Sequence, residues 1–191
     1  MMIHVCNHQK ESPVSVAQVT RLVKQAAKQL NIDVSGTMSI TFIPNARMKA
    51  LNRRFTGHHR FTDVLSFRYD GEPIIGEILI APRQAKRYAA AHAVPYRQEL
   101  ARYVVHGLLH WLGHEDRTIA QRRIMRAMEN DLLIRCGIFK TAHSTPRPAN
   151  HDCRGRQHTA HRRPVRQRRS PVSCLLSPVS NGIFCSCRPN R

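Results

Sequence analysis

The chain has 191 residues, 41% of them hydrophobic, and a formal net charge of +19 at pH 7, which suits one ordinary domain plus an appendage. The basic surplus favours a polyanionic partner, nucleic acid, over a surface that is merely solvated. No apolar run is long enough for a membrane span and the N-terminus has no signal-peptide core, so we expect a cytoplasmic protein with no membrane partner and six reduced cysteines.

The composition changes near residue 140. Residues 1–139 carry regular apolar periodicity, whereas residues 140–191 contain 11 Lys or Arg, a single acidic residue and little apolar pattern. Such a segment cannot bury enough surface to offset the entropy lost on ordering it. We therefore expect a folded domain at 1–139 and a disordered, basic C-terminal extension at 140–191. The extension is either an arginine-rich RNA-binding arm or a segment with no selected role.

The first half of the domain is predicted to alternate helix and strand. The expected elements are a helix over 13–30, a strand over 37–43 and a helix over 45–55. Ser12 or Ser15 can cap the first helix, and Asn45 the second. The inward stripe of the first helix would be Val16, Val19, Val23, Ala26, Ala27 and Leu30.

The second half is predicted to hold a β-hairpin followed by three helices. The expected elements are strands over 62–69 and 74–81, and helices from Pro82 to Pro95, over 97–112 and over 118–135, the last with Ile124, Met125, Met128 and Leu132 inward. The fold class is therefore α+β: a small mixed β-sheet in a single layer, packed with about five helices.

The helix over 97–112 carries the sequence's most informative motif, HGLLHWLGHED. His106 and His110 are four residues apart, so both imidazoles project from one face of the helix. Gly113 then stops the helix, and the chain turns back with three further donors at residues 114–116. Two neutral imidazoles and one donor from the turn form a three-ligand zinc site with a position open to water. The alternative is a pair of buried histidines with no ligand.

Three blocks of this sequence resemble the signature blocks of the YbeY family of metal-dependent endoribonucleases and rRNA maturation factors. They are LNRRFTGHHRFTDVLSF at 51–67, GEILIA at 76–81 and HGLLHWLGHED at 106–116. The likeness covers nearly all of residues 1–139, in the expected order, and leaves the basic extension outside it.

The resemblance implies the metal ligands. The family binds zinc through three histidines in the motif His-Gly-x-Leu-His-Leu-x-Gly-Tyr-Asp-His, and these positions fall on His106, His110 and Asp116 of this chain. An aspartate oxygen is a competent zinc ligand, and His114 would substitute only if the turn were re-routed. A carboxylate ligand should weaken the Lewis acidity of the ion and broaden the choice of metal toward iron or manganese.

A second departure from the family pattern concerns the substrate. The family usually has an Arg directly before the glycine of the loop that precedes Thr-Asp-Val-Leu-Ser-Phe, and this chain has Thr56 there. If that Arg holds phosphate, the resemblance implies that Arg54 or Arg60 replaces it.

The resemblance implies a single-strand-type, metal-dependent endoribonuclease acting in ribosomal RNA maturation and ribosome quality control. Its partners would be ribosomal RNA and the small ribosomal subunit, without an organic cofactor. No catalytic base is assigned, because Glu115 is either a proton acceptor or an exposed turn residue. One rival is a non-catalytic RNA-binding assembly factor with a structural metal. The other, a zinc peptidase, needs Glu directly after the first histidine, where this chain has Gly107.

Overall fold

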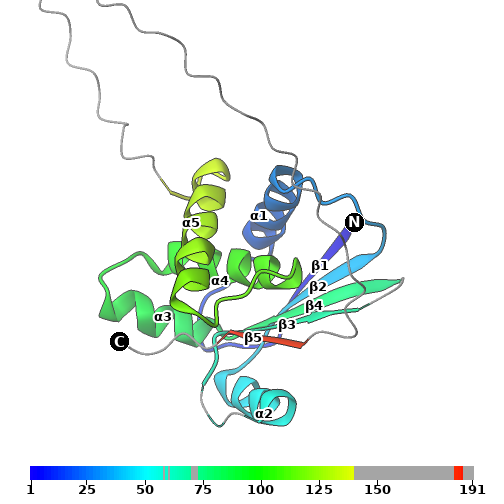
Figure 1. Cartoon of the computed structure of the whole chain (residues 1–191). Helices are drawn as coiled ribbons and strands as arrows, with labels where there is room; N and C mark the ends of the chain where they lie inside the picture. Colours follow the sequence, from blue (N-terminus) through cyan, green and yellow to red (C-terminus); the bar gives the residue numbers. More distant parts are fainter. Residues whose placement is uncertain (58, 60, 70–72, 140–182, 187–191) are drawn as a thin grey trace, which may run out of the picture.

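One mixed β-sheet organises the part of the chain that the computed structural model describes, namely residues 1–57, 59, 61–69, 73–139 and 183–186 (Figure 1). The helices are α1 (Val16–Gln29), α2 (Asn45–Thr56), α3 (Pro82–Ala91), α4 (Tyr96–Trp111) and α5 (Ile119–Arg135). The strands are β1 (Met2–Asn7), β2 (Thr37–Phe42), β3 (Val64–Arg68), β4 (Ile74–Ile80) and β5 (Ile183–Ser186).

The strand order is β1-β2-β4-β3-β5. β1, β2 and β4 are parallel, and β3 runs antiparallel to both of its neighbours. Parallel neighbours need a long crossover, which α1 supplies between β1 and β2, whereas the antiparallel strands β3 and β4 follow each other directly. The predicted α+β class, with a small mixed sheet and about five helices, is confirmed.

The helices are divided unequally between the two faces of the sheet. In Figure 1, α1, α4 and α5 lie on one face, and α2 lies on the other. Alternate residues of a strand point to opposite faces, so Met38, Ile40 and Phe42 of β2 enter the larger core beneath α1 and α4. A smaller cluster, which includes Met48 of α2 and Leu65 of β3, fills the space under α2.

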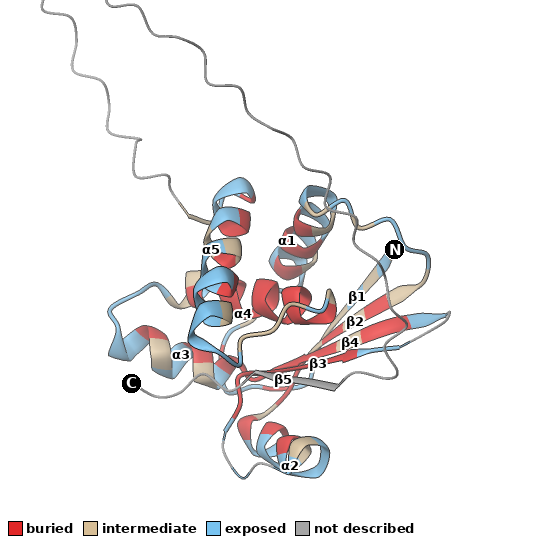
Figure 2. Ribbon diagram, in the orientation of Figure 1, coloured by how far each residue is buried: buried red, intermediate tan, exposed pale blue. Residues whose placement is uncertain are grey.

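Helix α4 is the centre of the larger core, and Figure 2 shows it as buried along nearly all of its length. Gly107 allows it to approach the sheet closely, because a Cβ atom there would lie 2.6 Å from Ile78 Cγ2 and 2.9 Å from Val64 Cγ1. The Ser66 hydroxyl donates a hydrogen bond of 3.1 Å to the Gly107 carbonyl oxygen. A helix that is enclosed in this way holds its side chains in fixed positions.

Of the two predicted caps of α1, Ser15 is the one observed: its hydroxyl accepts a hydrogen bond of 3.4 Å from the Gln18 backbone amide. Other details differ from the predictions. Asn45 is the first residue of α2 and does not cap it. Val16 and Ile124 were expected inward, but they are 38% and 60% exposed, because the buried stripes of α1 and α5 are rotated away from them.

Two strands were not predicted at all. β1 pairs with β2 at one edge of the sheet, and β5 pairs with β3 at the other edge. β5 lies within the extension that was expected to be disordered, and the rest of residues 140–191 lies outside the described residues. None of the described helices combines the length and hydropathy needed to cross a bilayer.

Candidate metal centre

The predicted histidine pair lies on a buried face of α4, one helical turn apart. His106 and His110 are 1% and 2% exposed, and their Nε2 atoms are 3.1 Å from each other. The two rings are nearly perpendicular, with an interplanar angle of 89°. The i, i+4 spacing therefore brings two ring nitrogens to one point, as the sequence predicted.

The turn after α4 brings the third donor to the same point. Gly113 adopts a φ of +94°, which reverses the chain, and the His114 backbone amide donates a hydrogen bond of 3.0 Å to the Leu109 carbonyl oxygen. Asp116 Oδ1 then lies 3.7 Å from His110 Nε2, and Oδ2 lies 3.9 Å from His106 Nε2. One ligand atom from each of these three residues, the metal triad, lies within 4.8 Å of the others.

The Asp116 turn is also held from α5. Arg122 Nη1 donates hydrogen bonds to the backbone carbonyl oxygens of Arg117, at 2.7 Å, and of Asp116, at 3.2 Å. Thr118 and Gln121 complete a capping box at the start of the same helix. The position of Asp116 is thus fixed by the beginning of α5 as well as by the end of α4.

A series of buried polar contacts connects His106 of the metal triad to Glu129, Arg102 and Glu99. His106 Nδ1 is 2.7 Å from Glu129 Oε1, and Glu129 Oε2 accepts from Arg102 Nη1 at 2.7 Å. Arg102 Nε lies 3.6 Å from Glu99 Oε2. Glu99, Arg102 and Glu129 are 4%, 8% and 2% exposed, respectively.

The charges and protonation states at this site suit a divalent cation. In this set of contacts the three acidic side chains Glu99, Glu129 and Asp116 outnumber the one guanidinium, that of Arg102, and an excess of buried negative charge favours a cation. Burial, and secondly the neighbouring His106, lower the pKa of His110 to about 3. His110 is therefore neutral at pH 7, which is the form that coordinates a metal.

The donor spacing also fits a metal ion. Tetrahedral zinc with bonds of about 2.0–2.1 Å separates its ligand atoms by roughly 3.3 Å. The two Nε2 atoms are 3.1 Å apart, Asp116 Oδ1 lies 3.7 Å from His110 and Asp116 Oδ2 lies 3.9 Å from His106. With one ligand atom per residue, all three atoms lie within 4.8 Å of one another, so an ion could bind them after side-chain movements that bring the donors closer together. The residues present therefore fit the zinc ion that the sequence implied.

The other predicted residues are less well connected to this site. His114 belongs to none of the metal-type clusters in the described part of the chain, and burial lowers the pKa of its imidazole. Glu115 is half-exposed and lies 3.4 Å from the guanidinium of Arg117, as expected of a turn residue. Arg54 is exposed on α2 with its guanidinium 5.8 Å from the Phe55 ring centroid. Arg60 lies outside the described residues.

Glu129 contacts this site, and its place there was not predicted from the sequence. On α5 the buried positions are Met125, Glu129, Leu132 and Leu133, so the glutamate occupies a place that helical periodicity assigns to an apolar side chain. An acid at a core position signals a buried partner. The partner itself, His106, could not be identified from spacing because it lies 23 residues away on another helix.

A well-defined cavity lies elsewhere in the described part of the chain. It has a volume of about 540 Å³ and lies between α2 and the sheet, with Arg47, Phe55, Phe67, Arg68 and Glu77 among its lining residues. None of the metal triad lines it, and the strands separate it from α4. This cavity is therefore not the reaction centre that the triad would form.

Comparison with known proteins gives matches that agree with one another. A family model described as Endoribonuclease YbeY matches residues 4–137. A Geobacillus kaustophilus protein with this description is 34% identical over 156 residues, which cover 73% of this chain and 100% of that protein. Its counterpart in Persephonella marina is 33% identical over 121 residues, which cover 60% of this chain and 78% of that protein.

Proposed function

This chain belongs to the endoribonuclease YbeY family, and from that premise we propose that it is a metal-dependent endoribonuclease of ribosomal RNA maturation and ribosome quality control. It would hydrolyse phosphodiester bonds in single-stranded RNA in the cytoplasm, with the small ribosomal subunit as its partner. The observation that supports this most directly is the convergence of His106, His110 and Asp116 in a chain whose relatives are described as endoribonucleases.

The metal triad would hold one zinc ion, with iron or manganese as alternatives because one ligand is a carboxylate. When bound, the ion would supply a Lewis acid and lower the pKa of its water toward 7. His106 and His110 are almost fully buried and expose little surface to a substrate. Their role would therefore be to bind and orient the ion. Arg54 or Arg60 would place positive charge against the phosphate.

A second candidate is a non-catalytic RNA-binding assembly factor in which the metal only joins α4 to the turn. Two departures from the family motif favour it: Thr56 in place of the usual Arg, and Asp116 in place of the third His. A zinc peptidase is disfavoured, because Gly107 faces Ile78 and Val64 and leaves no room for a catalytic glutamate side chain.

Cleavage of a structured RNA with single-stranded loops tests the proposal. The metal-loaded parent is compared with His110→Ala, and with His4→Ala as a control that removes an exposed histidine on β1. Circular dichroism establishes that all three are folded at the assay temperature. We expect the parent and H4A to cleave and H110A to fall to background.

The alternative outcomes separate the candidates. Equal cleavage by the parent and H110A would indicate a contaminating nuclease and remove the support for an enzyme. A parent that binds metal and RNA without cleaving would favour the assembly factor.

A further inference from the structure

We propose that Glu129 is a positioning residue of the metal centre, which fixes the tautomer and orientation of His106 and is itself held by Arg102. The inference rests on the proposed function, because it assumes that His106 binds the metal. It goes further in making α5, which contributes none of the metal triad, part of the machinery that sets metal affinity.

The contact between Glu129 and His106 is short and buried away from solvent. Glu129 Oε1 lies 2.7 Å from His106 Nδ1, and both side chains are 2% exposed. This distance is typical of a charge-assisted hydrogen bond. Water can neither replace the contact nor screen it at this depth, so the carboxylate determines how the ring is oriented.

The direction of this hydrogen bond follows from the other side of the carboxylate. Glu129 Oε2 accepts from Arg102 Nη1 at 2.7 Å, which keeps the carboxylate ionised and therefore purely an acceptor. His106 Nδ1 must then donate. The neutral ring carries its lone pair on Nε2, the atom that faces His110 and Asp116.

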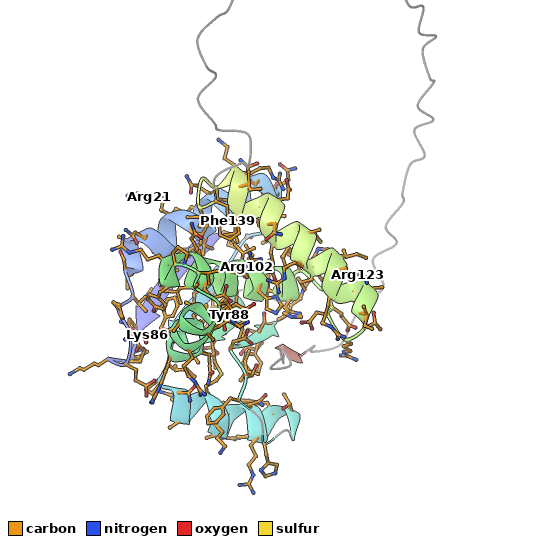
Figure 3. All side chains as sticks on the ribbon, turned by 90° about the vertical axis from the view of Figure 1, so that its left-hand side faces the viewer. Arg21, Lys86, Tyr88, Arg102, Arg123 and Phe139 are labelled. Atoms are coloured by element: carbon orange, nitrogen blue, oxygen red, sulfur yellow. The ribbon has the colours of Figure 1, made fainter. Side chains whose placement is uncertain are left out.

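Arg102 is itself restrained. Its Nε lies 3.6 Å from Glu99 Oε2, and its Cζ lies 5.1 Å from the centroid of the Phe139 ring. In Figure 3, Arg102 lies at the centre of the molecule, whereas Arg123 lies at the outer surface of α5. A guanidinium held on two sides presents a fixed donor to Glu129, so the restraint extends from Glu99 to the metal ligand.

Metal affinity of the full-length chain tests the proposal. Glu129→Gln keeps the size of the side chain but removes its charge, and Asp131→Asn makes the same change at an exposed, ion-paired acid on the same helix. Zn²⁺ affinity is measured by competition with a chromophoric chelator, and the visible spectrum of the Co²⁺ form reports ligand geometry. We expect E129Q to bind Zn²⁺ about 10–100-fold more weakly, with an altered Co²⁺ spectrum, and D131N to match the parent.

Melting of the metal-free variants distinguishes positioning from general stability. A lower melting temperature of E129Q with parental Zn²⁺ affinity would assign Glu129 a structural role only and overturn the inference, while leaving the metal site intact. A parent that binds no Zn²⁺ would overturn the metal site and this inference together.

A second variant covers the case in which E129Q does not fold. Glu129→Asp retains the charge that Arg102 requires but withdraws the carboxylate from His106 by one methylene. We expect weaker Zn²⁺ binding than in the parent, and unchanged affinity would overturn the inference.

Discussion

Asp116 is the residue that distinguishes this candidate metal centre from the family motif. The residue supplies an oxygen where the family motif has a nitrogen, and both of its carboxylate oxygens lie within 4 Å of the histidine pair. An anionic ligand reduces the net charge of a bound ion, which lowers its Lewis acidity and favours harder metals. We therefore expect this one side chain to influence both the preference for a metal and the reactivity of the ion.

Asp116→Ala should therefore lose metal, and Asp116→His should retain it. The alanine removes one of three donors, whereas the histidine restores the three-nitrogen set of the family motif. Metal content of protein purified without added metal, and Zn²⁺ affinity by competition, provide the measurements. A D116A variant with parental metal content would show that another donor serves as the third ligand.

Gly107 determines how closely the histidine helix approaches the sheet. A methyl group there would lie 2.6 Å from Ile78 Cγ2 and 2.9 Å from Val64 Cγ1, two branches of stiff side chains. Gly→Ala gains up to about 1 kcal/mol of helix propensity, whereas overpacking a core costs about 1–3 kcal/mol. We expect Gly107→Ala to lower the free energy of unfolding of the metal-free protein, measured in urea. Unchanged or higher stability would mean that α4 can shift away from the strands.

The residues of the site were predictable only where they are close in sequence. His106, His110 and residues 114–116 lie within one helix end and its turn, so spacing and a glycine stop were enough to group the two histidines with a donor from the turn. The choice of Asp116 among the three turn residues came from the family resemblance. Glu129 and Arg102 meet across two helices, and that contact depends on how α5 packs on α4. Sequence periodicity identifies a buried face but not the residue it will contact.

The helices and strands, like the site residues, were predictable only where the signal is local in the sequence. The helices and the β3–β4 hairpin have strong local signals and were predicted. β1 was missed because its apolar–polar alternation is confined to Ile3, His4 and Val5, which is too short a stretch to distinguish a strand from a loop. As an edge strand in parallel pairing, it is specified by β2, which lies some thirty residues along the chain.

The start of α4 is tied to the segment before α1, and this contact gives a pH-dependent prediction. The Tyr96 hydroxyl donates to the Pro13 carbonyl oxygen at 2.9 Å, and burial raises the pKa of Tyr96 from 10.0 to about 12. The folded state thus binds the phenolic proton more tightly than the unfolded chain, so stability is lost as the pH rises from 10 to about 12. Tyr96→Phe should remove this part of the alkaline loss.

The measurement is the urea midpoint of the parent and Y96F at several pH values from 9 upward. The other three tyrosines and the lysines titrate in both proteins, so only the difference between the two curves reports Tyr96. Parallel curves would show that the Tyr96 hydroxyl is not perturbed by the fold.

At the scale of the whole molecule, the apolar core residues and the basic side chains are distributed differently along the chain. Among the described residues, the apolar clusters that hold the fold together are built from residues before 140, whereas residues 140–191 of the sequence contribute 11 of the 31 basic side chains. Within the described part of the chain, the extension contributes only β5, at the edge of the sheet. Without it, β3 would become an edge strand and the sheet would keep four strands, enough for a stable sheet packed on helices.

Truncation after Lys140 should therefore leave a cooperatively folding, metal-binding domain. Thermal melting by circular dichroism checks the fold, and loss of a cooperative transition would show that β5 is required.

The full-length and truncated forms also test the basic extension. If it contacts phosphate, log affinity for single-stranded RNA should fall more steeply with log salt for the full chain, by about 0.7 per phosphate contacted. We expect the steeper slope in the full chain; identical slopes would mean that the extension takes no part in RNA binding.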